Sequence, residues 1–84
     1  MTKVRIPPIL RPATGGEREV PASGETVGAV LDDLTERFPD LEHQLAYANV
    51  YVEGEDVRTL ESGFDTPVRE GSTVILLPAM AGGA

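Results

Sequence analysis

Two adjacent glycines, Gly82 and Gly83, lie almost at the carboxyl end and are the residues with the clearest chemical meaning. A carboxylate that has to reach a nucleotide phosphate or a nucleophile deep inside a partner is best delivered on backbone alone, because a Cβ would widen the segment and restrict its dihedral angles. The preceding residues, Ala79, Met80 and Ala81, carry no polar side chain that would have to lose water in such a channel. The ending therefore indicates insertion into another protein's active site. The alternative is a tail without function, because a glycine pair alone is a weak signal.

Other reactive side chains are scarce. The chain contains no cysteine, which excludes disulfides, thiolate metal sites, iron–sulfur clusters and cysteine nucleophiles. The single histidine, His43, stands among Asp40, Glu42 and Gln44 without a second histidine to complete a metal shell or a catalytic pair. We interpret it as a solvated loop residue and expect no metal site and no bound cofactor. Any sulfur chemistry would have to use something other than a side-chain thiol.

Length and charge limit the classes of function. The 84 residues allow one domain, with 40% hydrophobic and 25% charged residues, as in an ordinary globular protein. A net charge of −7 argues against nucleic acid or an anionic membrane as a partner and favours a basic protein surface. Neither an apolar run of about 20 residues nor a signal peptide is present, so a cytoplasmic location is expected.

The diglycine must be positioned by the strand that precedes it. Residues 73–77 are apolar on both faces, with Val74 and Leu76 pointing one way and Ile75 and Leu77 the other. Such a strand is usually central in its sheet, and a central C-terminal strand pairs most simply in parallel with the N-terminal strand. Pro78 then ends the strand and begins the stalk of the tail.

The clearest helix runs from about Gly24 to Phe38, because its apolar residues recur at the spacing of one helical stripe. Either Ser23 or Thr26 is a suitable N-cap. Leu41, Leu45 and Tyr47 are expected to extend the packing through a short turn. In the N-terminal part we expect a strand in residues 1–10 that bends at Pro7-Pro8, a hairpin connection at 11–16 and an edge strand at 17–21. After the helix we expect a second hairpin, formed by residues 49–53 and 57–58 around a turn at 54–56. A loop or minimal strand at 60–66 and a turn at 70–72 complete the prediction.

These elements predict an α+β fold, a mixed sheet of four to five strands with one main helix on one face. Residues 1–78 would form the domain, and residues 79–84 a flexible tail that is mobile in the free protein. Since only one helix is available, the second face of the sheet stays open. We expect Ile75 and Leu77 on that face to recognise a partner, with Pro78 and the stalk contributing. The alternative is that the segment 60–67 folds over this face.

This order of elements and the ending resemble the β-grasp fold of ubiquitin-like proteins, and within it the sulfur-carrier family that includes the small subunit of molybdopterin synthase and the thiamine-pathway carrier. The similarity is closest to the carriers of bacterial cysteine biosynthesis and covers essentially the whole chain. The residues that carry it are Asn49-Val50-Tyr51-Val52, Glu55-Asp56-Val57-Arg58, Asp65-Thr66-Pro67, Glu70-Gly71 and Val74-Ile75-Leu76-Leu77-Pro78-Ala79-Met80-Ala81-Gly82-Gly83.

The resemblance implies a protein co-substrate without an active site of its own. An E1-like activating enzyme would use ATP to adenylate the carboxylate of Gly83, and sulfur would displace AMP to leave a thiocarboxylate. A biosynthetic enzyme, such as a pyridoxal-phosphate sulfhydrylase of cysteine biosynthesis, would then take the sulfur. Ala84 follows Gly83, whereas the family member that this chain resembles ends at the second glycine, so a metalloprotease that removes Ala84 is expected as a further partner.

Three other functions stay open. The chain could be a ubiquitin-like modifier joined to lysines of its targets, a fixed small subunit of molybdopterin synthase, or a β-grasp binding domain whose tail has no role. Lys3 is the only lysine, which makes polymeric conjugates of the protein with itself unlikely but leaves single attachment possible.

Overall fold

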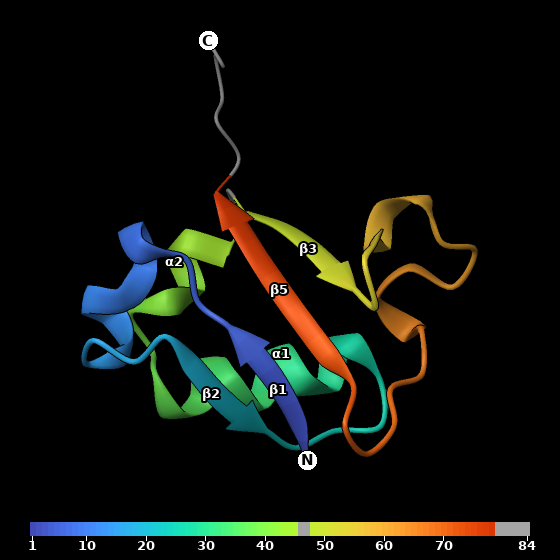
Figure 1. The fold of residues 1–84 in the computed structure, drawn as a ribbon, viewed down its shortest axis with the longest axis horizontal. Helices are drawn as coiled ribbons and strands as arrows, with labels where there is room; N and C mark the ends of the chain where they lie inside the picture. The colour runs from blue at the N-terminus through green and yellow to red at the C-terminus, as the bar shows by residue number, and fades with distance from the viewer. Residues whose placement is uncertain (46–47, 79–84) are drawn as a thin grey trace, which may run out of the picture.

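A computed structural model describes residues 1–45 and 48–78 of the chain. Within these ranges, five strands form one mixed sheet in the order β2-β1-β5-β3-β4 (Figure 1). The strands are β1 (Thr2–Arg5), β2 (Glu19–Ala22), β3 (Ala48–Val52), β4 (Glu55–Asp56) and β5 (Thr73–Pro78). The two-faced apolar strand is central as predicted, since β5 pairs in parallel with β1 and antiparallel with β3.

One long helix, α1 (Val27–Arg37), crosses a single face of the sheet, and the predicted helix is confirmed. The structure also decides its N-cap: the hydroxyl of Thr26 accepts a hydrogen bond from the Ala29 N–H at 3.1 Å. The segment after Pro39 differs from the expected short turn, because residues Leu41–Leu45 form a second helix, α2. Leu41 is fully buried there, and this anchor explains why the segment coils back onto the core.

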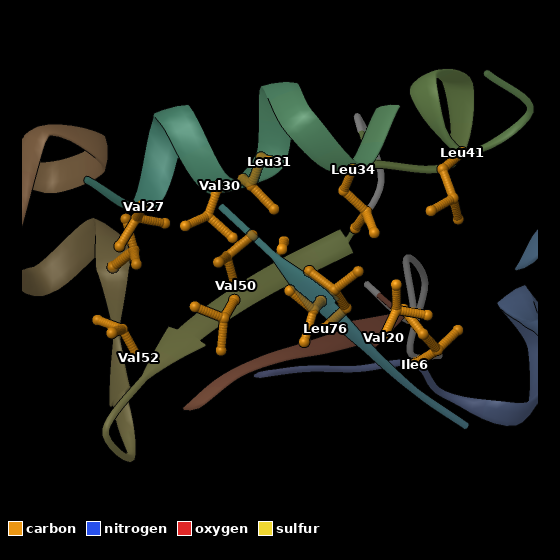
Figure 2. Close-up of a cluster of buried hydrophobic side chains, with 14 of the residues drawn as sticks. Ile6, Val20, Val27, Val30, Leu31, Leu34, Leu41, Val50, Val52 and Leu76 are labelled. Atoms are coloured by element: carbon orange, nitrogen blue, oxygen red, sulfur yellow. The ribbon is translucent and has the colours of Figure 1, made fainter. Parts of the chain in front are cut away.

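The core lies between α1 and the sheet. Figure 2 shows side chains of α1 pointing toward those of the strands, with Leu41 of α2 at one end. The helix contributes Val27, Val30, Leu31 and Leu34, and the strands contribute Val4, Val20, Ala22, Val50, Val52, Val74 and Leu76. The inward residues alternate along each strand, so the other side chains must occupy the opposite face of the sheet.

The N-terminal strand is shorter than expected, and its connection to β2 is helical. The strand ends at Arg5, and residues Pro8–Thr14 form a 3-10 helix, η1. Pro7 and Pro8 lack the N–H groups that a strand needs, and a proline is well tolerated in the first turn of a helix. Leu10 is buried, and η1 ends at Gly15, whose φ of 67° lies in the left-handed region. The expected antiparallel pairing of β1 with β2 is confirmed.

The second hairpin turns one residue earlier than predicted. Its turn is Glu53-Gly54, whose φ angles of 52° and 83° are both positive, as a type I′ turn requires. The returning strand is therefore β4, and Val57 instead starts a 3-10 turn, η2 (Val57–Thr59), with its side chain buried in the core.

The segment that follows does not cover the open face of the sheet. A third 3-10 turn, η3 (Gly63–Asp65), packs against the start of α1, where the Val27 N–H donates to the Thr66 carbonyl at 3.0 Å. The Val68 N–H likewise donates to the Glu25 carbonyl at 3.0 Å. The alternative that residues 60–67 fold over the outward face is therefore wrong, because these bonds hold the segment on the helix side.

The helices of the described ranges are too short and too polar to cross a lipid bilayer.

Candidate functional site

The candidate site is the end of β5, from which the diglycine tail continues. Pro78 is the last strand residue and pairs with Ala48, where β3 begins. The other predicted site residues, Ala79, Met80, Ala81, Gly82, Gly83 and Ala84, lie outside the described residues. The expectation that residues 79–84 form a flexible tail therefore also lies outside the described residues. The described part of the site is therefore the surface around the base of this tail.

The outward face of β5 is apolar and accessible. Val74 and Leu76 are 0% and 1% exposed on the helix side, whereas Leu77 is 43% exposed and Ile75 is half-buried on the other side. Figure 1 looks onto this outward face, with α1 behind the sheet and no described element in front of β5. Ile75 and Leu77 thus lie side by side where the tail leaves the sheet, as predicted for a recognition surface.

Strand pairing places polar and aromatic residues beside this apolar pair. Ile75 lies opposite Arg5 of β1 and opposite Tyr51 of β3, and Leu77 lies opposite Asn49. Directly opposed residues on one face have Cβ atoms about 5 Å apart, so their side chains are in reach of one another. We refer to Arg5, Asn49, Tyr51, Ile75 and Leu77 as the outward patch.

A shallow cleft of about 540 Å³ borders the outward patch on the β1 side. It opens where η1 leaves the sheet, because β1 stops at Arg5 while β5 continues to Pro78. Its apolar lining comes from Ile6, Pro7, Pro8, Ile75, Leu76 and Leu77, and its charged lining from Arg5, Arg11, Arg18 and Glu19. We call it the arginine cleft.

Hydrogen bonds fix the backbone around the arginine cleft. The Ile6 N–H donates to the Arg18 carbonyl at 2.9 Å, and Arg11 donates from Nε to the Ile6 carbonyl at 3.1 Å. The buried Thr14 hydroxyl closes η1 by bonding to the carbonyls of Arg11 and Glu17, each at 3.1 Å. These bonds fix the main chain that carries the three arginines, and they bring Arg11 and Arg18 back beside the end of β1.

Sequence reasoning missed these arginines and Tyr51 as site residues. Arg5 could have been found, because Lys3 and Arg5 alternate with the buried Val4 and so share the face of Ile75. Arg11 and Arg18 could not, because a hairpin connection at 11–16 and an edge strand at 17–21 do not predict the 3-10 helix that brings them together. Tyr51 could also have been found, because the buried Val50 and Val52 place it on the outward face.

One ion pair lies at the other border of the outward patch. Arg58 donates from Nη2 to Oδ2 of Asp56 at 3.0 Å, and its backbone N–H donates to Oδ1 at 2.9 Å. The side-chain hydrogen bond from Arg58, together with the backbone bond, lowers the pKa of Asp56 below its usual value. Asp56 itself lies opposite Tyr51. This arginine is thus already paired within the chain.

The described ranges contain no group of three acidic or histidine side chains that could hold a metal ion. His43 lies exposed on α2.

Comparison with known proteins gives the family. The model of the ThiS family matches residues 4–83. A curated relative, the sulfur carrier protein CysO of Mycobacterium tuberculosis, is 42% identical over 95% of this chain and 96% of its own. Among solved structures, CysO in the Amycolatopsis orientalis BexX/CysO complex has a TM-score of 0.85 and 40% identity, covering 94% of this chain and 96% of that one. The small archaeal modifier protein 1 of Methanosarcina acetivorans has a TM-score of 0.86 and 30% identity, covering 98% and 95%. With its five-stranded β-grasp sheet and single long helix, the chain belongs to the ThiS family of ubiquitin-like sulfur carriers, which are carrier proteins and not enzymes.

Proposed function

We propose that this protein carries sulfur as a thiocarboxylate on the main chain of Gly83. The observation that carries the proposal is the combination of a sulfur-carrier family with a chain that has no cysteine, so that the sulfur needs a main-chain site. An E1-like enzyme first joins the Gly83 carboxylate to AMP with release of pyrophosphate from ATP. A sulfur nucleophile then displaces AMP, and the carrier leaves with the sulfur.

The recipient that we propose is an enzyme of cysteine biosynthesis, such as a pyridoxal-phosphate sulfhydrylase. Support comes from the relatives, which are named as sulfur carrier protein CysO. A solved relative, CysO, forms a complex with BexX. This complex supports the role of a carrier that docks on separate proteins. A molybdopterin synthase subunit would instead co-purify with its larger chain in fixed stoichiometry, and this distinguishes the two roles.

A second candidate function is protein modification. It is favoured by the similarity to a small archaeal modifier protein, whose TM-score matches those of the carriers. Conjugation would use the same activated Gly83, with a lysine of the target as nucleophile in place of sulfur. Lys3 is exposed on β1 and is the only lysine of this chain, so it is the only side chain at which the protein could modify itself in this way.

The surface that meets the activating enzyme is, in this proposal, the outward patch. Ile75 and Leu77 are the apolar residues next to the tail on a face that the described elements leave uncovered. Apolar side chains at the centre of a patch with polar residues around it are the usual composition of a protein interface. A partner seated there also covers the point where the tail leaves the sheet, so it can lead the diglycine into its active site.

Activation further requires that Gly83 carry a free carboxylate. Ala84 displaces the carboxylate by about 3.3–3.6 Å along an extended chain and adds a Cβ where only glycine is expected. Misplacements near 1 Å can already cost about a hundredfold in rate. We therefore infer a peptidase that cleaves the Gly83–Ala84 bond, for which a zinc metalloprotease is the natural candidate.

The test compares the full chain with a form that ends at Gly83. Each is incubated with ATP, the activating enzyme and a sulfide source, and intact mass reports the exchange of one carboxylate oxygen for sulfur. We expect thiocarboxylate only on the form that ends at Gly83. Equal yields from both forms would show that removal of Ala84 is unnecessary, and no thiocarboxylate on either form would contradict the carrier mechanism itself.

A further inference from the structure

The basic residues of this acidic chain are unevenly distributed. Lys3, Arg5, Arg11 and Arg18 lie in β1, in η1 and directly before β2, and none of them has an ion-pair partner among the described residues. Arg37 and Arg58, by contrast, are paired with Asp33 and Asp56. Three of these cations, Arg5, Arg11 and Arg18, line the cleft near the base of the tail, where the acidic residue is Glu19, opposite Arg5.

The arginine cleft has the composition of a carboxylate-binding site. Three arginines and one glutamate line it, a net of two positive charges on a protein whose total charge is −7. In the described chain the guanidinium of Arg11 makes one hydrogen bond, from Nε, which orients the group and leaves its Nη nitrogens for other acceptors. The planar guanidinium presents donors that match a carboxylate in two-point contact. Placing three such groups together costs repulsion that an incoming anion would relieve.

The apolar part of the cleft restricts the kind of anion. Ile6, Pro7 and Leu76 are buried beneath it, so its accessible apolar surface comes from Pro8, Ile75 and Leu77, of which Leu77 is 43% exposed. A small inorganic anion would leave this apolar surface in water, whereas a peptide with both carboxylate and aliphatic side chains would cover it. The cleft is also continuous with the outward patch, since Arg5, Ile75 and Leu77 belong to both.

We propose that the arginine cleft binds an acidic segment of the partner protein that receives the tail, with carboxylates on Arg5, Arg11 and Arg18 and an aliphatic side chain against Leu77. This inference deepens the proposed function and rests on it for the identity of the partner. It differs from the expectation from net charge, which favours a basic partner surface, because the local charge of the cleft is positive and its complement is acidic. The five residues from Ala79 to Gly83 span at most about 18 Å, so the partner's reactive centre lies within about that distance of Pro78.

Binding can be tested without any sulfur chemistry, so failure here is distinct from failure of the carrier mechanism. The probe is a 12-residue peptide of glutamate and leucine, added to the isotope-labelled full-length protein, with the corresponding glutamine peptide as control. We expect amide resonances of residues 5, 6, 11, 18 and 75–77 to shift with the glutamate peptide alone. Lowering ionic strength from about 0.15 M to about 0.01 M lengthens the Debye length from about 8 Å to about 30 Å and should tighten binding.

The variant R5E/R18E keeps Arg11 and its bond to Ile6, and should weaken peptide binding at least about tenfold, because two charge pairs become repulsive. The control is K3E/R69E, which makes the same charge change at the other end of β5, since Lys3 lies opposite Thr73 and Arg69 lies in the loop before that strand. Retained spectra establish that both double variants are folded. Equal weakening by K3E/R69E, or equal shifts with the glutamine peptide, would overturn the proposal. Tighter binding of inorganic phosphate or ATP at the same residues would also overturn it, because the cleft would then be a phosphate site.

Discussion

At the scale of single residues, Asp56 shows how charge is organised at the border of the outward patch. Its carboxylate accepts from both the side chain and the backbone N–H of Arg58, and the side-chain bond is the main cause of its lowered pKa. A carboxyl whose pKa is lowered on folding stabilises the folded state above its ordinary pKa, and this contribution is lost as the pH falls through the folded value. Arg58 is thereby held beside Tyr51 and does not add a free cation to the patch.

The variant Arg58→Ala tests whether Arg58 lowers the pKa of Asp56. It removes the side-chain bond but keeps the backbone N–H, so the pKa of Asp56 should rise part of the way toward about 3.9, the value for an unperturbed aspartate. Carbon-detected NMR titration of the carboxyl group measures this directly. An Asp56 pKa that is the same in both proteins would show that Arg58 does not hold the carboxylate.

At the scale of elements, alternate side chains of β5 lie on opposite faces of the sheet, one set in the core and the other exposed. Leu76 lies in the core, and replacing it by alanine leaves a cavity, so Leu76→Ala should lower the free energy of unfolding by about 2–5 kcal/mol. Leu77→Ala removes the same atoms from a side chain that is 43% exposed and should cost about 1 kcal/mol or less. Urea unfolding of the two variants compares neighbours on one strand. Equal losses would contradict the assignment of Leu77 to the outward face.

The hydroxyl of Thr26 caps the start of α1. Thr26→Ala removes the hydroxyl that satisfies the Ala29 N–H, and should cost about 1 kcal/mol, or about 4–8 °C in Tm for a domain of this size. Thr26→Ser keeps a capping hydroxyl and serves as the control. If both substitutions lower Tm equally, packing of the threonine methyl group, and not the cap, is what stabilises the helix.

At the scale of the whole molecule, the described chain has two layers, a sheet and the helix α1 on one of its faces. The molecule is 17 Å thick in its shortest dimension, which corresponds to one helix on one sheet. The helix side carries the core and the η3 turn, while the outward side carries Ile75, Leu77 and the arginine cleft. The core and the proposed recognition surface therefore lie on opposite faces, and stability and partner recognition should respond separately to mutation.

The variant Leu77→Asp tests this separation. It places a charge in the outward patch and should lower kcat/KM of the activating enzyme for the carrier by about tenfold or more, with the fold intact. The matched control is Phe64→Asp, because Phe64 is a similarly exposed apolar residue on η3, next to Gly28 of α1. Unchanged activation of a folded Leu77→Asp protein, or equal loss in the control, would contradict recognition through the outward patch.

The sequence by itself determined the features that depend on local periodicity and composition. The stripe of α1, the two-faced pattern of β5 and the missing cysteines were enough to predict a mixed sheet with one helix and an open face carrying Ile75 and Leu77. Turn positions were less accurate. At Pro7-Pro8 and at Glu53-Gly54 several local conformations have similar energies, and burial of Leu10 and Val57 decides among them.

Only the tertiary structure revealed the arginine cleft. Arg5, Arg11 and Arg18 meet Leu77 because β1 pairs in parallel with β5 and η1 folds back beside their ends, and neither contact leaves a periodic signal in the sequence. A net charge summed over the chain does not record which face each charge occupies, and so it does not indicate a local group of cations. Pairing between segments more than 50 residues apart is decided by burial of the whole core, and it is this pairing that places the cations beside the tail.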